Sequence, residues 1–288
     1  MLDAKLLTFL EVARLGSYTR AAERLHLTQP AVTQHIRKLE EHYRRKLMDT
    51  SGRAVRLTAA GEEVLSYARL QLNNERRLME RLSEGQRPLC VGATLSIADY
   101  YLPPRLSRYL SGGGTPPHVE VGNTETLLSR MHNGDLDCAL IEGLFDEAVF
   151  EADIWLNASF VPIARAGHPL ACGMRTLREL CGYPLLLREP GSGTRAVLEN
   201  ALFQRGMSPD SFLKSAELGG FGLIKAVLAA TDAVSFMYEG VCRAEIEAGT
   251  LCELPVADFS LVRPLYFLRL RGGPEGERCN AFYEAVRA

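Results

Sequence analysis

The first sixty residues alternate short amphipathic stretches with capping and turn residues. The first apolar run repeats at helical spacing and ends at Gly16. Ser17 can cap a second short helix that ends at Leu25, and Thr28 is a good N-cap for a third. Pro30 falls in the first turn of that third helix, where its missing N–H costs little. Three helices with a short turn between the second and third predict a helix-turn-helix.

The predicted third helix has one apolar face and one polar face. Val32, Ile36 and Leu39 follow helical spacing and should pack inward. The opposite stripe is short, polar and nearly free of acidic residues, as a helix that enters the major groove of DNA requires. An ordinary solvated helix is the alternative, but it would more often mix Glu with Lys. We predict that the reading face consists of Pro30, Thr33, Gln34 and Arg37.

A short extended segment follows the third helix. Residues 55–57 predict a strand that the turn Ser51-Gly52 precedes, so this segment would form a wing. Arg53 and Arg56 would then lie close to phosphates or to a narrow minor groove.

Beyond the wing, Thr58 can cap a long helix with a single apolar stripe. Such a stripe needs a partner to cover it. A second copy of the chain would also supply the second DNA-binding domain with which helix-turn-helix proteins bind two half-sites. We therefore expect a homodimer through this helix. The stripe keeps coiled-coil spacing, with Glu75 as an interruption, at Leu65, Ala68, Leu72, Met79 and Leu82.

The pattern changes after Pro88. Short apolar runs alternate with helical stretches, which predicts open α/β sheets, and two sheets fit this length better than one. We expect a multidomain chain with three parts: an all-α winged helix-turn-helix at 1–58, a linker and dimerisation helix at 59–87, and an α/β effector-binding domain at 88–288.

Charge is divided unevenly between these parts. The chain has a net charge of −2, but residues 1–87 hold 16 Lys or Arg against 11 Asp or Glu. A basic segment on an acidic body suggests a polyanion-binding module, here double-stranded DNA. No apolar stretch is long enough for a membrane span, and the N-terminus lacks the features of a secretory signal, so we expect a cytoplasmic protein.

Two segments rich in hydroxyl or glycine residues follow predicted strands and begin helices. In open α/β sheets, ligands lie beyond the carboxyl ends of strands, where helix N-termini offer free N–H groups. These groups favour a small anion, a carboxylate or an oxyanion, although a simple capped turn is the alternative for Gly191 to Arg195. The expected effector-binding residues are Thr94, Leu95, Ser96, Ser192, Gly193, Thr194, Arg195 and Gly220.

Catalytic and metal-binding motifs are missing from the sequence. Gly191-Ser192-Gly193 is not a nucleophile elbow, and the six histidines show no metal-ligand spacing. No two of the seven cysteines have the C-x-x-C spacing of a metal or dithiol site. Cys172 and Cys181 could form a redox pair, but nothing near them in the sequence lowers a thiol pKa. We therefore expect no metal, no cofactor and no enzyme activity. The alternative is a solute-binding or enzymatic α/β protein whose N-terminal helices serve only oligomerisation. The reading face and the charge division favour the regulator.

With these residues placed, the chain resembles the LysR-type transcriptional regulators over its full length. The most specific match runs from Phe9 to Glu40, and Arg53 to Gly61 (RAVRLTAAG) matches the wing and the start of the linker helix. Gly167-His168-Pro169-Leu170 and the segment REPGSGTR from Arg188 to Arg195 resemble the effector-binding part. From the helix and wing patterns together with this resemblance, the expected DNA-binding residues are Thr28, Gln29, Pro30, Thr33, Gln34, Arg37, Lys38, Arg53 and Arg56.

The chain departs from the family between the third helix and the wing. Where the family usually has glycine, this chain has Arg44, which must then take the glycine conformation or let the helix continue. Thr50 stands in place of an arginine, and Arg44, Arg45 or Lys46 could replace that phosphate contact.

The resemblance also implies an assembly and an architecture. It implies a homotetramer built as a dimer of dimers, an operator with imperfect two-fold symmetry, and RNA polymerase as a candidate partner. The effector domain would be periplasmic-binding-protein-like (type II), with a small-molecule effector between two lobes. Lobe I would comprise about residues 88–160 and 264–288 and lobe II about 161–263.

Overall fold

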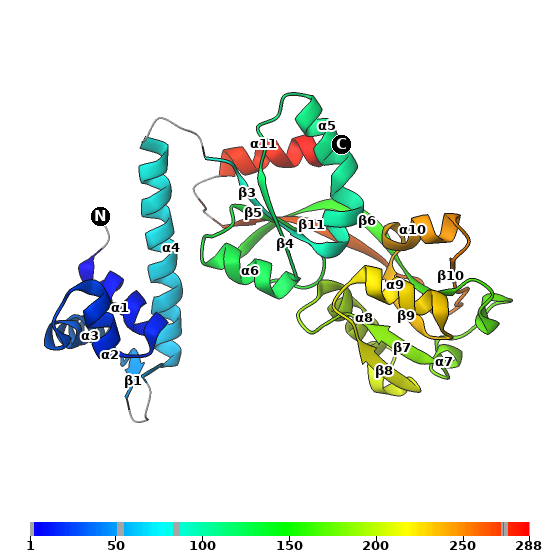
Figure 1. Ribbon diagram of the computed structural model, residues 1–288, viewed down its shortest axis with the longest axis horizontal. Helices are drawn as coiled ribbons and strands as arrows, with labels where there is room; N and C mark the ends of the chain where they lie inside the picture. Colours follow the sequence, from blue (N-terminus) through cyan, green and yellow to red (C-terminus); the bar gives the residue numbers. More distant parts are fainter. Residues whose placement is uncertain (1–2, 51–54, 83–86, 272, 274–275, 288) are drawn as a thin grey trace. The chain divides into compact units, whose positions relative to one another are not determined.

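The computed structural model describes residues 3–50, 55–82, 87–271, 273 and 276–287 (Figure 1). The chain forms two compact units, one made mainly of the residues up to Arg87 and one mainly of those from Pro88 onward. In the part of the chain described, no helix has both the length and the apolar character needed to cross a membrane.

The first unit is built on three short helices around one core. Gly16 ends the first helix in the left-handed conformation, with φ of 62°. The Ser17 hydroxyl accepts from the backbone N–H of Arg20 and caps the second. Thr28 caps the third, and its hydroxyl accepts from the N–H of Ala31 at 3.3 Å. These helices are α1 (Ala4–Leu15), α2 (Tyr18–Leu25) and α3 (Gln29–Tyr43). Their buried side chains include Phe9, Val12, Ala21, Val32, Ile36 and Leu39.

A two-stranded ribbon and a long helix complete this unit. Strands β1 (Met48–Asp49) and β2 (Arg56–Leu57) pair antiparallel, as the predicted wing requires. Helix α4 (Ala59–Leu82) follows, and the Thr58 hydroxyl accepts from the N–H of Gly61 at 3.0 Å. A Cβ on Gly61 would come within 2.1 Å of the Leu47 carbonyl oxygen, so only glycine allows this close contact between α4 and the ribbon.

The apolar stripe of α4 divides into two halves. Leu65 and Ala68 are buried within the protomer's own structure. Leu72 and Met79 are 42% and 61% exposed, and the Leu82 side chain lies outside the described set. Two of the five seam residues are therefore covered within one chain, and two of the others are exposed.

The second unit is a two-lobed α/β structure whose strands follow the order β4-β3-β5-β11-β6-β9-β7-β8, with β10 on β6. Its strands are β3 (Cys90–Thr94), β4 (His118–Gly122), β5 (Cys138–Ile141), β6 (Phe150–Arg165), β7 (Pro184–Leu187), β8 (Lys214–Glu217), β9 (Val234–Tyr238), β10 (Leu251–Glu253) and β11 (Val262–Leu270). Its longer helices are α5 (Leu102–Ser111), α6 (Thr124–His132), α8 (Gly193–Phe203), α9 (Phe221–Ala230), α10 (Glu239–Glu247) and α11 (Gly276–Arg287). The short helical turns are η1 (Ile97–Tyr101), η2 (Pro169–Ala171), α7 (Leu177–Leu180) and η3 (Pro209–Ser211).

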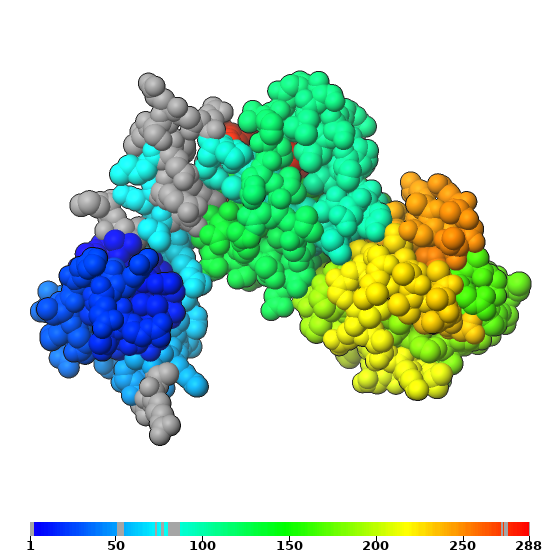
Figure 2. Space-filling model, in the orientation of Figure 1, coloured from blue at the N-terminus to red at the C-terminus, as the bar shows by residue number. Residues whose placement is uncertain are grey.

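Strand β6 belongs to both lobes. Its residues 150–159 pair antiparallel with β11, and from Phe160 onward it pairs with β9 and β10. In lobe I, β3 runs parallel to β4 and β5, and in lobe II, β7 runs parallel to β8 and β9. The lobes form two distinct masses in the space-filling view, lobe I mostly green and lobe II mostly yellow and orange (Figure 2).

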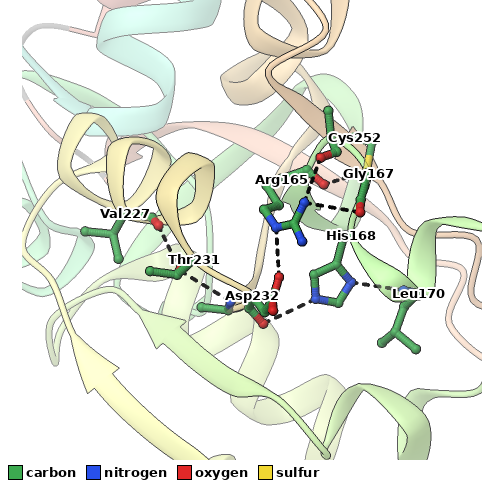
Figure 3. A network of polar contacts seen from close by, with 10 residues as sticks. Arg165, Gly167, His168, Leu170, Val227, Thr231, Asp232 and Cys252 are labelled. Atoms are coloured by element: carbon green, nitrogen blue, oxygen red, sulfur yellow. Dashed lines mark hydrogen bonds and ion pairs between the residues drawn. The ribbon is translucent and has the colours of Figure 1, made fainter.

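The segment from Gly167 to Leu170 has a structural role in lobe II (Figure 3). His168 is buried, and its Nδ1 accepts from the N–H of Leu170 at 3.1 Å, so its Nε2 carries the proton toward the Asp232 carbonyl oxygen at 3.2 Å. Arg165 also reaches Asp232, with its Nε donating to the carboxylate at 2.8 Å. These contacts tie the end of β6 to the turn before β9.

Candidate functional site

The outward stripe of α3 is open, as its pattern predicts. Gln34, Arg37 and Lys38 are exposed, and in the described part of the chain their side chains make no hydrogen bond or ion pair. Thr33 is half-buried, and its hydroxyl donates to the Gln29 carbonyl oxygen at 3.0 Å and accepts from the Gln29 side chain at 3.3 Å. Thr28, Gln29 and Pro30 are also exposed and begin the same face.

Helix α3 ends in the first of the two ways that the replacement of glycine by Arg44 left open. Arg44 takes the left-handed conformation, with φ of 52°. Its exposed side chain lies with Arg37, Arg45 and Lys46 around a shallow surface pocket of about 400 Å³, which Glu40 and Glu41 also line. On the ribbon, Arg56 is exposed, whereas Arg53 lies outside the described residues.

Three of the hydroxyl groups expected to bind the effector gather at one point, between the end of β3 and the start of α8. Thr94 is the last residue of β3, Ser96 follows it, and Thr194 lies in the first turn of α8. All three are almost fully buried. They come from different lobes, since β3 belongs to lobe I and α8 to lobe II.

Their common partner is the carboxylate of Glu142, which directly follows β5 and is 1% exposed. Thr94 donates to Oε2, Ser96 donates to Oε1 at 2.6 Å, and Thr194 donates to Oε1 at 3.0 Å. The hydroxyls expected to hold a free anion therefore hold a carboxylate of the chain itself.

The backbone around Glu142 brings the lobes into direct contact. The Thr124 hydroxyl, at the start of α6, donates to the Glu142 carbonyl oxygen at 2.8 Å. A Cβ on Gly193 would lie 2.2 Å from the same carbonyl oxygen and 2.5 Å from the Thr124 hydroxyl. Gly193, which the sequence predicted to bind the effector, thus also allows the backbone of lobe II to pack against that of lobe I.

A pocket of about 390 Å³ lies beside this contact. It is lined from lobe I by Thr124, Glu125, Leu128 and Leu144, and from lobe II by Pro190, Gly191, Ser192, Gly193, Arg195, Ala196 and Glu199. The guanidinium of Arg195 donates to the carboxylates of Glu199 and Glu217, each at 2.7 Å, so its charge is partly neutralised.

The expected effector residues thus separate into three groups. Thr94, Ser96 and Thr194 bind Glu142, and Ser192, Gly193 and Arg195 line the pocket. Leu95 packs against the core, and Gly220 caps α9; neither lines the pocket of about 390 Å³.

Sequence reasoning missed Glu142 and Thr124. The available signal for Glu142 was an acidic residue directly after the four apolar residues of a buried strand, at the edge where ligands gather. The described residues include no cluster of His, Cys, Asp and Glu that could hold a metal ion. Burial raises the pKa of the Cys181 thiol, which favours its unreactive form.

Two family models match the chain along nearly all its length. The model named "Bacterial regulatory helix-turn-helix protein, lysR family" matches residues 4–62, and "LysR substrate binding domain" matches residues 82–288. The chain belongs to the LysR family. It is therefore a transcriptional regulator that binds DNA through its helix-turn-helix and carries an effector-binding domain.

Relatives of this LysR-family chain cover its full length. The RuBisCO operon transcriptional regulator of Allochromatium vinosum is 31% identical, over 98% of this chain and 94% of that protein. The fold matches full-length LysG from Corynebacterium glutamicum with bound effector Arg, with a TM-score of 0.68, 20% identity, and 99% and 98% coverage of the two chains. It also matches the CcmR regulatory domain of Synechocystis PCC6803 in complex with 2-PG, with a TM-score of 0.62, 24% identity, and 70% and 96% coverage.

Proposed function

We propose that this LysR-family regulator acts in the cytoplasm as a homotetramer, a dimer of dimers, on an operator with two-fold symmetry. Residues 1–58 would bind DNA, 59–87 would join two protomers, and 88–288 would bind a small anionic effector. The cytoplasmic location rests on the proposed operator, which lies in that compartment. The polar stripe of α3 is the observation that carries this proposal, because the exposed side chains of Gln34, Arg37 and Lys38 have no partner among the described residues and are free to contact DNA.

The proposed DNA contacts are of two kinds. Thr33, Gln34 and Arg37 would contact base edges, since they lie on the open stripe of α3. The residues that would hold phosphates or position the helix are Thr28, Gln29, Pro30, Lys38, Arg53 and Arg56. Arg44 and Arg45, on the basic pocket after α3, would replace the phosphate contact that Thr50 cannot make.

The proposed effector site is the pocket between the lobes. Its volume of about 390 Å³ suits a small metabolite. Ser192, Arg195 and the N-termini of α6 and α8 favour an anion there, although Glu125 and Glu199 line the same pocket. Among relatives, CcmR is in complex with 2-PG, whereas LysG holds Arg, so neither charge nor size follows from the fold alone.

The proposed oligomer rests on α4. Leu72 and Met79 are exposed on the apolar stripe of this helix, and a second copy of α4 is the economical cover for them.

Selection of bound duplexes from a random-sequence pool tests the DNA part of the proposal. The full-length chain should enrich a motif with two related half-sites whose centres are about ten base pairs, or a multiple, apart. A pool that enriches no motif contradicts the proposal.

Thermal unfolding of the full chain with small carboxylates and phosphate esters tests the effector part. At least one anion should raise Tm in a saturable manner. Ser192→Ala should weaken that shift, whereas Ser215→Ala, on the exposed strand β8, should not. Equal shifts in both variants would place the effector elsewhere.

A further inference from the structure

The carboxylate of Glu142 makes the contacts that a bound anion would make. Three hydroxyls converge on its two oxygens, from Thr94 and Ser96 in lobe I and from Thr194 in lobe II. Hydroxyl donors from two lobes around one carboxylate are the arrangement that we predicted for a ligand. In this chain a side chain fills it.

Within the part of the chain that the structure describes, no Lys, Arg or His forms an ion pair with Glu142. No side chain there other than the three hydroxyls is hydrogen-bonded to its carboxylate, since Thr124 binds the backbone carbonyl oxygen instead. Burial of a carboxyl group without an ion-pair partner is unfavourable unless hydrogen bonds compensate for it, and the three hydroxyls supply such bonds. Nearby, the Tyr238 phenol is buried without a hydrogen-bond partner, and its pKa is raised first by burial and next by the charge of Glu142.

The same carboxylate joins the lobes. The hydrogen bond from Thr194 to Glu142 links α8 to the end of β5, and the Gly193 backbone packs directly against the Glu142 carbonyl oxygen. The N–H of Glu125 also donates to the Gly191 carbonyl oxygen across this boundary, at 3.3 Å. The lobes are thus brought together by a residue of the chain.

We propose that Glu142 is a tethered occupant of an anion subsite in the effector cleft. It takes the place of a free carboxylate or oxyanion, and such an anion reaches Thr94, Ser96 and Thr194 only when Glu142 leaves. This inference rests on the proposed function, since it takes the cleft to be the effector site. The inference adds two points to that function. In the wild type, Glu142 closes the subsite to free anions, and the three hydroxyls have the arrangement that binds an anion.

Removal of the Glu142 side chain should open the subsite to a small carboxylate. The experiment compares full-length wild type and Glu142→Ala by thermal unfolding at pH 7 in sodium acetate, with sodium chloride at equal ionic strength as the reference. Acetate should stabilise Glu142→Ala in a saturable manner, with affinity at least about tenfold tighter than for wild type. Adding Thr94→Val to Glu142→Ala should abolish the gain, because one of the three donors is lost.

Glu142→Gln is the matched control. Its amide has nearly the size of the carboxylate, so the subsite stays filled and acetate should bind no better than to wild type. An acetate effect that is equal in wild type and Glu142→Ala would overturn the proposal. An equal gain in Glu142→Ala and Glu142→Gln would do so too, because charge alone would then explain it. Weaker acetate binding to Glu142→Ala than to wild type would also overturn the proposal, because the vacated subsite would then not accept a free anion.

A second measurement applies if Glu142→Ala does not fold. Thr194→Val removes only the donor from lobe II, and amide exchange should then become about tenfold faster at residues 124–125 and 191–194, the equivalent of one lost hydrogen bond. Unchanged exchange would contradict a link between the lobes through Glu142. Neither readout involves DNA or the natural effector. A negative result for acetate or for amide exchange would therefore not affect the outcome of the DNA selection. A negative DNA selection would likewise not affect the acetate result.

Discussion

The carboxylate of Glu40 on α3 accepts a hydrogen bond from the backbone N–H of Leu47 at 3.0 Å. The same oxygen accepts from the N–H of Met48 at 3.4 Å, and the other oxygen accepts from Lys46 at 2.8 Å. One acidic side chain thus fixes the chain between α3 and the ribbon. The short connection that departs from the family sequence is held by this residue.

These bonds make the stability of the first unit depend on pH. Burial acts to raise the pKa of Glu40, but the hydrogen bonds from Lys46, Leu47 and Met48 outweigh it, so the pKa lies below its usual value. A lowered pKa contributes stability above the unfolded pKa of about 4.3, and this contribution is lost as pH falls through the lower folded pKa.

Glu40→Gln should therefore destabilise this unit by roughly 1–2 kcal/mol at pH 7, and the difference from wild type should shrink below about pH 4. Amide exchange of α3 measures the effect in this unit alone. Glu41→Gln, at an exposed neighbouring position, is the control and should change little. A penalty of the same size at pH 7 and pH 3 would show that charge is not involved.

Arg44→Gly should stabilise α3. The left-handed conformation costs a non-glycine residue about 1–2 kcal/mol, and the greater backbone entropy of glycine offsets about 0.5–1 kcal/mol of that gain. The net gain is roughly 0.5–1 kcal/mol, again measured by exchange of the α3 amides. Arg45→Gly lacks the positive φ and should be destabilising. If Arg44 contacts phosphate, its loss should also lower the salt dependence of DNA binding by about one unit of slope.

Replacement of both Leu72 and Met79 by Glu should separate the protomers that α4 joins. Their exposed side chains lie on the open half of the apolar stripe, and buried acidic groups would be costly there. Sedimentation of the full chain should show smaller species. Tyr67 is 48% exposed on the same helix but lies off the stripe. Tyr67→Glu is therefore the control and should leave the oligomer intact. An unchanged sedimentation coefficient in the double variant would remove α4 from the interface.

The sequence predicted those features that depend on local periodicity and capping. The faces of α3, the cap at Thr28 and the conformation of Arg44 all follow from short-range sterics and hydrogen bonding. The same pattern could not say whether an apolar stripe is covered by its own chain or by a partner, since periodicity marks only what is apolar. Leu65 and Ala68 turned out to be covered by their own unit.

In the cleft between the lobes, the positions of the hydroxyls could be predicted from the sequence but their partner could not. The ends of β3, β5 and α8 could be placed together from topology, so the convergence of Thr94, Ser96 and Thr194 was predictable in outline. Whether their hydroxyls face a ligand or a side chain depends on the rotamer of Glu142, a contact 48 residues distant from Thr94. No local pattern carries that information.

The most direct test of the whole account is footprinting of the selected operator with Thr33→Ala combined with Arg37→Ala. We predict loss of specific protection, with unchanged oligomer size, because both side chains lie on the outward stripe of α3, Arg37 exposed and Thr33 half-buried. Arg178→Ala removes one positive charge from an exposed site in lobe II and should keep the wild-type footprint. Full protection of the operator by the double variant would show that α3 is not the element that reads DNA.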